Sequence, residues 1–346
     1  MSSPLVDLSQ SLASLVESAK LRTVELLGAR VPASATWWSP KGLAVTVAHA
    51  MGDNDQGFVV THDGQKLPAR VLGRDPSHDL ALLQIDAPAA LLAELEAAGA
   101  FAHLSTSDEA SDEDGLRVGE LALTLGLARR RVSATLGMVS DLGPAWRTRL
   151  GGKIDAWIDV DAALPRGSAG GPLLSSDGRL LAINTHGLTQ RGASIPLSTV
   201  ARTVERLEAR GDLRPGFLGV RFQPARLQGH PSRERALVVT GVQEGGPAAE
   251  GGVSVGDIIL EVDGQAVQRG DDLLAALSTR AGEPTEVELW RAGTSIRVEL
   301  TPVARPRFRR GRRGPEHGHA AEQGHEQGHG HDASHAHDAD LDPDDN

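Results

Sequence analysis

Gly167-Ser168-Ala169-Gly170-Gly171-Pro172 is the most informative segment of this sequence. It follows Ile158-Asp159-Val160-Asp161 and precedes another pair of strand-like runs, so it predicts a glycine-rich turn between strands. Short runs typical of strands recur elsewhere, at residues 42–47, 80–85, 119–124 and 180–184. Strands of this length, separated by Gly, Pro and Asp turns, predict a mostly β fold built as an antiparallel barrel or sandwich.

Composition limits the classes of protein that fit. A chain of 346 residues with 40 glycines and 19 prolines predicts two β-rich domains with many turns. The absence of cysteine excludes a disulfide and a thiol nucleophile. A net charge of -11 argues against general nucleic-acid binding. The N-terminal residues lack the pattern of a secretory signal and no run of about 18 apolar residues occurs, so we expect a cytoplasmic protein without a membrane span.

Changes of pattern along the chain divide it into five parts. Leu, Val and Ala recur at helical spacing near the start, and composition turns to strongly charged and polar after Pro306. We predict an N-terminal amphipathic helix at 1–22, a first β-rich domain at 23–200, a linker helix at 201–213, a second β-rich domain with short helices at 214–304, and a tail at 305–346.

Three of the four parts of an acyl-transfer site can be placed in the first domain. His49 follows an apolar strand, and Asp79 directly precedes one. An imidazole can act as a base for a nucleophile, and a carboxylate can orient that imidazole. The order His, Asp, then a glycine-rich nucleophile loop is that of the two-barrel chymotrypsin-like arrangement.

Taken together, these motifs resemble the HtrA/Deg family of serine proteases from about Leu12 to Ala304. The motifs that carry the resemblance are Thr46-Val47-Ala48-His49-Ala50, Asp75-Pro76-Ser77-His78-Asp79-Leu80-Ala81, the loop from Asp161 to Leu173, and Phe217-Leu218-Gly219-Val220. The resemblance implies a trypsin-like double β-barrel followed by one PDZ domain. It also implies a homo-oligomer of trimer type.

The loop departs from the family at the decisive position, because Ala169 stands where the family has its nucleophilic serine. The resemblance therefore assigns His49 as the base and Asp79 as its orienter, but it supplies no nucleophile. Ser168, one residue earlier, is the weak alternative. An oxyanion hole needs only backbone donors, so the N–H groups of Gly167 and Ala169 can still form one. We expect residues 185–187 and 192–195 to line the specificity pocket.

The second domain carries the features of a peptide-binding module. The resemblance implies that N–H groups in the turn Gly216-Phe217-Leu218-Gly219 hold a C-terminal carboxylate, while the peptide adds as a strand beside Val220. A helix at 271–277 is expected to select an apolar terminal residue. The domain could alternatively serve only to pack on the first one.

The tail differs in composition from both domains. Six arginines lie between Arg305 and Arg313, and residues 314–346 contain seven histidines and nine acidic residues. Such a segment cannot bury apolar surface and is expected to be disordered. The histidines are irregularly spaced, so we assign no defined metal site and no cofactor. Two roles remain open for the tail: it could bind Zn, Ni or Cu weakly, or it could keep the protein soluble. The seven histidines are His317, His319, His325, His329, His331, His335 and His337.

These observations lead to one main hypothesis and two alternatives. The main hypothesis is a proteolytically inactive HtrA-like protein, a pseudoprotease that binds unfolded or C-terminal peptide segments in protein quality control. The first alternative is an active ATP-independent serine endopeptidase in which the serine at position 169 was replaced by mutation, or in which Ser168 is the nucleophile. The second alternative is a metal-binding accessory protein that uses its histidine-rich tail.

Overall fold

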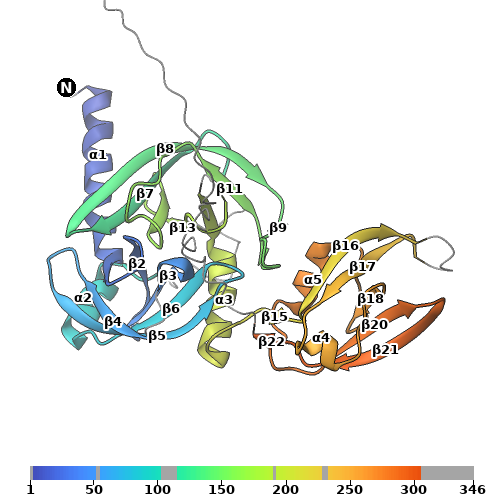
Figure 1. Cartoon of the computed structure of the whole chain (residues 1–346). Coiled ribbons are helices and arrows are strands. Elements are labelled where there is room, and N and C mark those ends of the chain that lie inside the picture. Colours follow the sequence, from blue (N-terminus) through green and yellow to red (C-terminus); the bar gives the residue numbers. More distant parts are fainter. Residues whose placement is uncertain (1–2, 52–54, 103–114, 190–191, 228–232, 305–346) are drawn as a thin grey trace, which may run out of the picture. The chain divides into compact units, whose positions relative to one another are not determined.

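The computed structural model describes residues 3–51, 55–102, 115–189, 192–227 and 233–304. They form two six-stranded β-barrels followed by a smaller β-sheet with short helices (Figure 1). The predicted fold class, mostly β with two barrels followed by a β-rich unit with short helices, is confirmed. Every strand pair is antiparallel within the described part of the chain. The calls on residues 305–346 lie outside the described residues.

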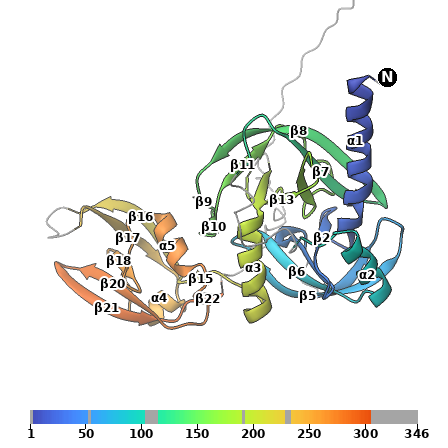
Figure 2. The same cartoon turned by 180° about the vertical axis from the view of Figure 1, so that it is seen from behind.

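The first barrel is closed, with the strand order β1-β2-β3-β6-β5-β4. Successive residues of β2 face opposite sides of the strand. Ala35 and Trp37, with Ala33 just before the strand, pack inside the barrel, whereas Ser34 and Thr36 form hydrogen bonds with the glycine-rich loop. A helix that the sequence analysis did not predict, α2 (Ala89–Ala97), lies beside this barrel (Figure 2). The strands are β1 (Thr23–Leu27), β2 (Ser34–Ser39), β3 (Leu43–Val47), β4 (Gln56–Val60), β5 (Lys66–Asp75) and β6 (Leu80–Ile85), with short 3-10 helices η1 (Lys20–Arg22) and η2 (Ala48–Ala50).

The second barrel follows the order β11-β8-β7-β12-β13-β14, and its end strands β11 and β14 lie in contact. Pro172 begins β12, so the glycine-rich loop leads directly into the middle of this sheet. The strands are β7 (Leu121–Ala128), β8 (Arg131–Gly143), β11 (Trp157–Val160), β12 (Pro172–Ser175), β13 (Leu180–Thr185) and β14 (Ala193–Pro196); β9 (Trp146–Arg147) pairs with β10 (Lys153–Ile154) separately.

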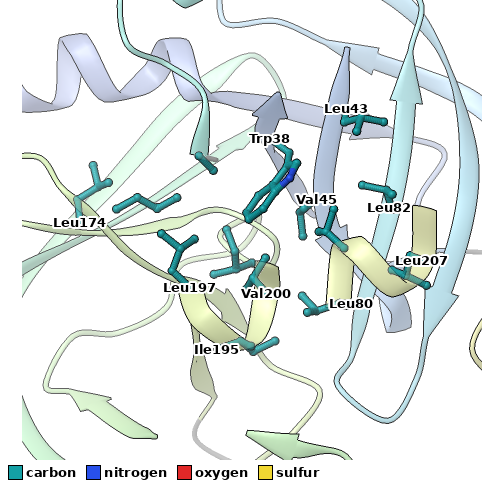
Figure 3. Close-up of a cluster of buried hydrophobic side chains, with 14 of the residues drawn as sticks. Trp38, Leu43, Val45, Leu80, Leu82, Leu174, Ile195, Leu197, Val200 and Leu207 are labelled. Atoms are coloured by element: carbon teal, nitrogen blue, oxygen red, sulfur yellow. The ribbon is translucent and has the colours of Figure 1, made fainter. Parts of the chain in front are cut away.

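A single apolar cluster joins the two barrels. Trp38 lies at its centre, with Val45 and Leu82 from the first barrel on one side and Leu174, Leu197 and Val200 on the other (Figure 3). All of these side chains are at most 7% exposed. At roughly 25 cal/mol per Å² of buried apolar surface, this seam contributes several kcal/mol that fix one barrel against the other. The site residues on the two barrels are therefore held by a shared core.

Two helices pack on this core. In α1 (Pro4–Ala19), the C-terminal half supplies Leu15, Val16 and Ala19 to the cluster. The helix α3 (Leu197–Arg210) buries Val204 and Leu207 and ends at Gly211, whose φ of +71° suits glycine. No helix among the described residues is long and apolar enough to cross a bilayer.

The C-terminal sheet has its own core, which includes Leu218, Leu237, Ile259, Leu273 and Leu289. Its strand order is β16-β17-β18-β20-β21, so β16 is an edge strand. The elements are β15 (Gly216–Phe217), β16 (Val220–Arg226), β17 (Arg235–Val242), α4 (Pro247–Glu250), β18 (Ile258–Val262), β19 (Gln265–Ala266), α5 (Gly270–Leu277), β20 (Thr285–Arg291), β21 (Thr294–Leu300) and β22 (Val303–Ala304).

Candidate active site

His49 and Asp79 meet at the site predicted from the sequence. His49 lies in η2 at the end of β3, and its Nδ1 lies 2.7 Å from Asp79 Oδ2. The His49 backbone N–H donates to Asp79 Oδ1 at 2.9 Å. The carboxylate is nearly buried, with its side chain 7% exposed, whereas the imidazole is 31% exposed. The carboxylate thus fixes the ring through Nδ1 and leaves Nε2 for another partner.

Asp79 is held in an uncommon backbone conformation. Its φ is +56°, in the left-handed region that a non-glycine residue rarely adopts. The Asp79 C=O accepts a hydrogen bond from the Ala48 N–H at 3.0 Å, which ties the turn to the residue before His49. The surrounding contacts therefore fix this conformation, as is common at functional sites.

Thr185, at the end of β13 in the second barrel, is a site residue to which the sequence analysis gave no role beyond lining the specificity pocket. Its hydroxyl donates to Asp79 Oδ2 and accepts from the Gly187 N–H at 2.9 Å. An ideal Cβ on Gly187 would overlap Asp79 Oδ2 and lie 2.8 Å from His49 Nδ1. The only signal in the sequence was a polar residue that ends an apolar strand shortly before a glycine.

His186 lies between Thr185 and Gly187 in the sequence and is solvent-exposed, although neighbouring atoms still cover part of its ring. Partial burial lowers the pKa of His186 below its usual value, and the charge of His49 lowers it further, while Asp79 acts in the opposite direction. An ideal Cβ on Gly192 would lie 3.6 Å from His186 Nδ1 and only 2.5 Å from Leu164 Cδ1. These contacts bring the expected pocket segments 185–187 and 192–195 next to the glycine-rich loop.

The glycine-rich loop is fastened to the first barrel. Ala169 is 1% exposed, and its C=O accepts from the Ser34 N–H at 2.8 Å. The Ser34 hydroxyl donates to the Gly167 C=O at 2.6 Å. Ala169 belongs to the same buried cluster as Val47 and Ala50, on either side of His49. Position 169 therefore sits between the two barrels on the side where His49 lies.

Contacts within the loop hold the Ser168 side chain and oppose a role as nucleophile. It is fully buried, and its hydroxyl donates to the Pro165 C=O at 2.8 Å. Its backbone N–H donates to the same carbonyl at 3.0 Å. The hydroxyl proton is thus already used within the loop.

Two backbone donors of the loop remain available. Neither the Gly167 N–H nor the Ala169 N–H donates a hydrogen bond to another of the described residues. Gly167 has a φ of +93°, which only glycine adopts readily, and a Cβ there would meet Ala128 at 2.6 Å. The pair predicted to form an oxyanion hole is free to receive a ligand oxygen.

A second carboxylate–imidazole pair, Asp75 and His78, precedes Asp79 and was not predicted from the sequence. Asp75 Oδ2 lies 2.7 Å from His78 Nδ1, while His78 Nε2 lies 3.1 Å from the Lys153 C=O. The hydroxyl of Thr148 donates to the Ser77 C=O at 2.6 Å. The turn that carries Asp79 is therefore bound to residues 148–153 of the segment that follows β8.

In the C-terminal sheet, the turn 216–219 has the geometry expected for a carboxylate-binding loop. Gly219 has a φ of +78°, and its C=O accepts from the Gln243 N–H at 2.7 Å. The Leu218 C=O accepts from the Ala248 N–H at 2.9 Å. The N–H groups of Leu218 and Gly219 donate to none of the described residues, so they remain available for an anion.

No group of three or more His, Cys, Asp or Glu side chains among the described residues could hold a metal ion. The seven tail histidines named above lie outside those residues, so weak metal binding by the tail stays a prediction.

Comparison with known proteins agrees with this geometry. Residues 33–183 match the model of the trypsin-like peptidase domain, and residues 238–291 match that of the PDZ domain. The chain is 32% identical over 280 residues to a probable periplasmic serine endoprotease DegP-like of Brucella suis biovar 1 (strain 1330), covering 78% of this chain and 52% of that protein. A DegP-like protein of Rhizobium meliloti (strain 1021) is 30% identical, with 85% and 58% covered. The chain thus spans about half the length of these curated relatives.

Solved structures show the same arrangement over nearly their whole length. The HtrA-type protease AlgW with decapeptide superposes with a TM-score of 0.60 at 26% identity, covering 85% of this chain and 98% of that one. The serine endoprotease from Yersinia pestis gives a TM-score of 0.59 at 25% identity, with 85% and 98% covered. With its trypsin-like peptidase domain and the PDZ domain that follows, the chain belongs to the HtrA/DegP family.

Proposed function

We propose that this protein binds unfolded or C-terminal peptide segments in the manner of an HtrA protease but does not cleave them. The observation that carries the proposal is Ala169, a buried methyl side chain at the nucleophile position of a loop that is otherwise complete. Removing the serine nucleophile of subtilisin costs about 10⁶-fold in turnover, which indicates the size of the loss.

The parts of the site that do not involve the side chain of residue 169 support this proposal. The His49–Asp79 pair, its Thr185 donor and the free N–H groups of the loop do not depend on the side chain at position 169. A peptide carbonyl can still be received by backbone donors, because a methyl group removes none of them. In the PDZ domain, a strand edge and a turn with free N–H groups suit a peptide terminus.

The test compares binding and cleavage on the same preparation. Fluorescence anisotropy with a labelled unfolded protein, such as reduced and alkylated lactalbumin, should show saturable binding, while mass spectrometry of the same mixture after a day should show no new fragments. Fragments that disappear when His49→Ala is used instead would contradict the proposal. Absence of binding to both the unfolded protein and C-terminal peptides would contradict it as well.

The cellular compartment of this protein is predicted independently of its function. The names of the curated relatives place those proteins in the periplasm. The cytoplasmic location expected from this sequence stays a prediction, which cell fractionation followed by immunodetection of the chain would test.

A further inference from the structure

A cavity of about 310 Å³ lies at one end of the first barrel. Three neighbouring strands contribute to its wall, since β4 pairs with β1 and β1 pairs with β2. Thr23 begins β1, Trp37 lies near the end of β2, and Thr61 directly follows β4. Because these strands are antiparallel, the three residues meet at the same end of the barrel. The ends of small barrels are common places for ligand sites.

The inner wall of the cavity is apolar and fixed in place. Trp37 is 1% exposed, and its ring meets that of Phe101 edge to face, with 6.4 Å between the ring centroids. The helix α2 supplies Leu91 and Leu95, which are four residues apart and so share one helix face. At ~30 Å³ for each water molecule, the space equals that of about ten waters, so it admits a ligand with one aromatic ring.

The exposed residues that line the cavity, at its mouth, are acidic. They are Asp63, in the turn after β4, and Glu94, on the cavity side of α2. The Thr61 hydroxyl donates to Asp63 Oδ1 and accepts from the Gln65 N–H at 3.0 Å, which holds the Asp63 carboxylate in place. The hydrogen bond from Thr61 lowers the pKa of Asp63, as does the charge of His62, while burial acts in the opposite direction. The mouth therefore carries two negative charges at pH 7.

We propose that this cavity binds a small molecule with an apolar body and a protonated amine. The apolar body packs on Trp37 away from water, and the ammonium group stays at the mouth with the carboxylates of Asp63 and Glu94. The Thr23 hydroxyl in the wall is buried without a partner among the described residues, and a polar atom of the ligand would satisfy it. None of the residues of the candidate active site lines the cavity, so this inference does not depend on peptide binding.

The experiment titrates the full chain by calorimetry with phenethylamine and with phenethyl alcohol, a neutral molecule of nearly the same shape. We expect saturable binding of the amine and a larger Kd for the alcohol. Leu91→Trp places a larger side chain in the cavity and should abolish binding of both. Glu94→Gln should raise the Kd of the amine about 2- to 5-fold, the effect of one exposed ion pair, and leave that of the alcohol unchanged.

Glu96→Gln is the matched control, because Glu96 is exposed on the same helix and does not line the cavity. Its Kd for the amine should equal that of the native chain. Amine binding that persists in a folded Leu91→Trp variant would overturn the proposal, since the amine would then bind elsewhere, as on the acidic residues of the tail.

The remaining outcomes are as decisive. Equal Kd values for the amine and the alcohol would overturn the assigned class of ligand, and no saturation up to about 10 mM amine would overturn the site itself. If circular dichroism shows that Leu91→Trp does not fold, the two glutamate variants decide, because each changes only a surface side chain. The same Kd for the amine in Glu94→Gln and Glu96→Gln would then overturn the proposal.

Discussion

His78 donates through Nδ1 to Asp75 Oδ2, 2.7 Å away, and its Nε2 lies 3.1 Å from the Lys153 C=O. Both ring nitrogens therefore lie within hydrogen-bond distance of an oxygen, so the imidazole bridges the Asp75 side chain and the Lys153 backbone. The side chains of Asp75 and His78 are 1% and 5% exposed. A buried carboxylate–imidazole pair therefore fixes the turn that carries Asp79.

Replacing one member of this pair should be costly. Asp75→Asn removes a buried carboxylate that accepts hydrogen bonds from Ser77 and His78, and we expect the free energy of unfolding of the peptidase domain to fall by about 1.5–3 kcal/mol at pH 7. Asp141→Asn, the same substitution at an exposed residue of β8, should change it by less than about 0.5 kcal/mol. Urea unfolding followed by tryptophan fluorescence measures this domain, because four of the five tryptophans lie between residues 37 and 157. Equal losses in the two variants would show that the pair contributes nothing.

The same pair predicts a dependence on pH. Burial alone would raise the pKa of Asp75, but the hydrogen bond and charge of His78, with hydrogen bonds from Ser77, outweigh burial and lower the pKa. A carboxyl whose pKa is lower in the folded state stabilises the fold above its unfolded value of about 3.9. That contribution is lost as pH falls through the folded-state pKa. The stability difference between the native chain and Asp75→Asn should therefore shrink below about pH 4; a difference that stays constant down to pH 2 would contradict the assignment.

Ala169→Ser should restore proteolysis if only the nucleophile has been lost. The new hydroxyl would stand in a loop whose Ser34 contacts and free N–H groups are already in place. We expect cleavage of reduced, alkylated lactalbumin and labelling by a fluorophosphonate probe, both abolished by adding His49→Ala. Ser168→Ala in the restored protein should retain most of the activity, because the Ser168 hydroxyl donates to the Pro165 C=O. Loss of labelling in Ser168→Ala would assign the nucleophile to Ser168 instead.

Thr185 should matter to that restored activity through Asp79. Thr185→Val removes the hydroxyl that donates to Asp79 Oδ2 and leaves the buried volume nearly unchanged. A hydrogen bond to a charged group contributes about 1.5–3 kcal/mol, so kcat should fall at least about 10-fold in the Ala169→Ser background. Thr203→Val is the control, because its hydroxyl bonds only to the Thr199 C=O within α3. If both variants lower kcat equally, Thr185 has no specific role in orienting the pair.

The sequence predicted His49, Asp79 and the loop because each sits in a local motif with its own strand or turn signal. The role of Thr185 was not predicted because its partner Asp79 lies 106 residues away in the sequence. The Asp75–His78 pair is local, but its contact with the Lys153 C=O joins residues 75 positions apart, so its structural role was not predicted either. The α2 helix was missed because its sequence is apolar nearly all round and lacks a capping side chain at Pro88. The strands could be predicted from short apolar runs between turn residues. The closure of the sheets into barrels could not, because it depends on which edge strands meet.

His186 gives a direct test of how His49 and Asp79 affect the pKa of a neighbouring imidazole. Partial burial lowers its pKa, and the nearby charge of His49 lowers it further, while Asp79 raises it. His49→Ala should therefore raise the pKa of His186 toward its ordinary value of about 6.5, and Asp79→Asn should lower it. NMR titration of the His186 Cε1–H resonance against pH, in histidine-labelled protein, measures the change in the pKa of His186 in each variant. Because the folded-state pKa lies below the unfolded one, protonation of His186 opposes folding as pH falls below about 6.5. Shifts of the same sign in the two variants would mean that His186 does not sense the His49–Asp79 pair.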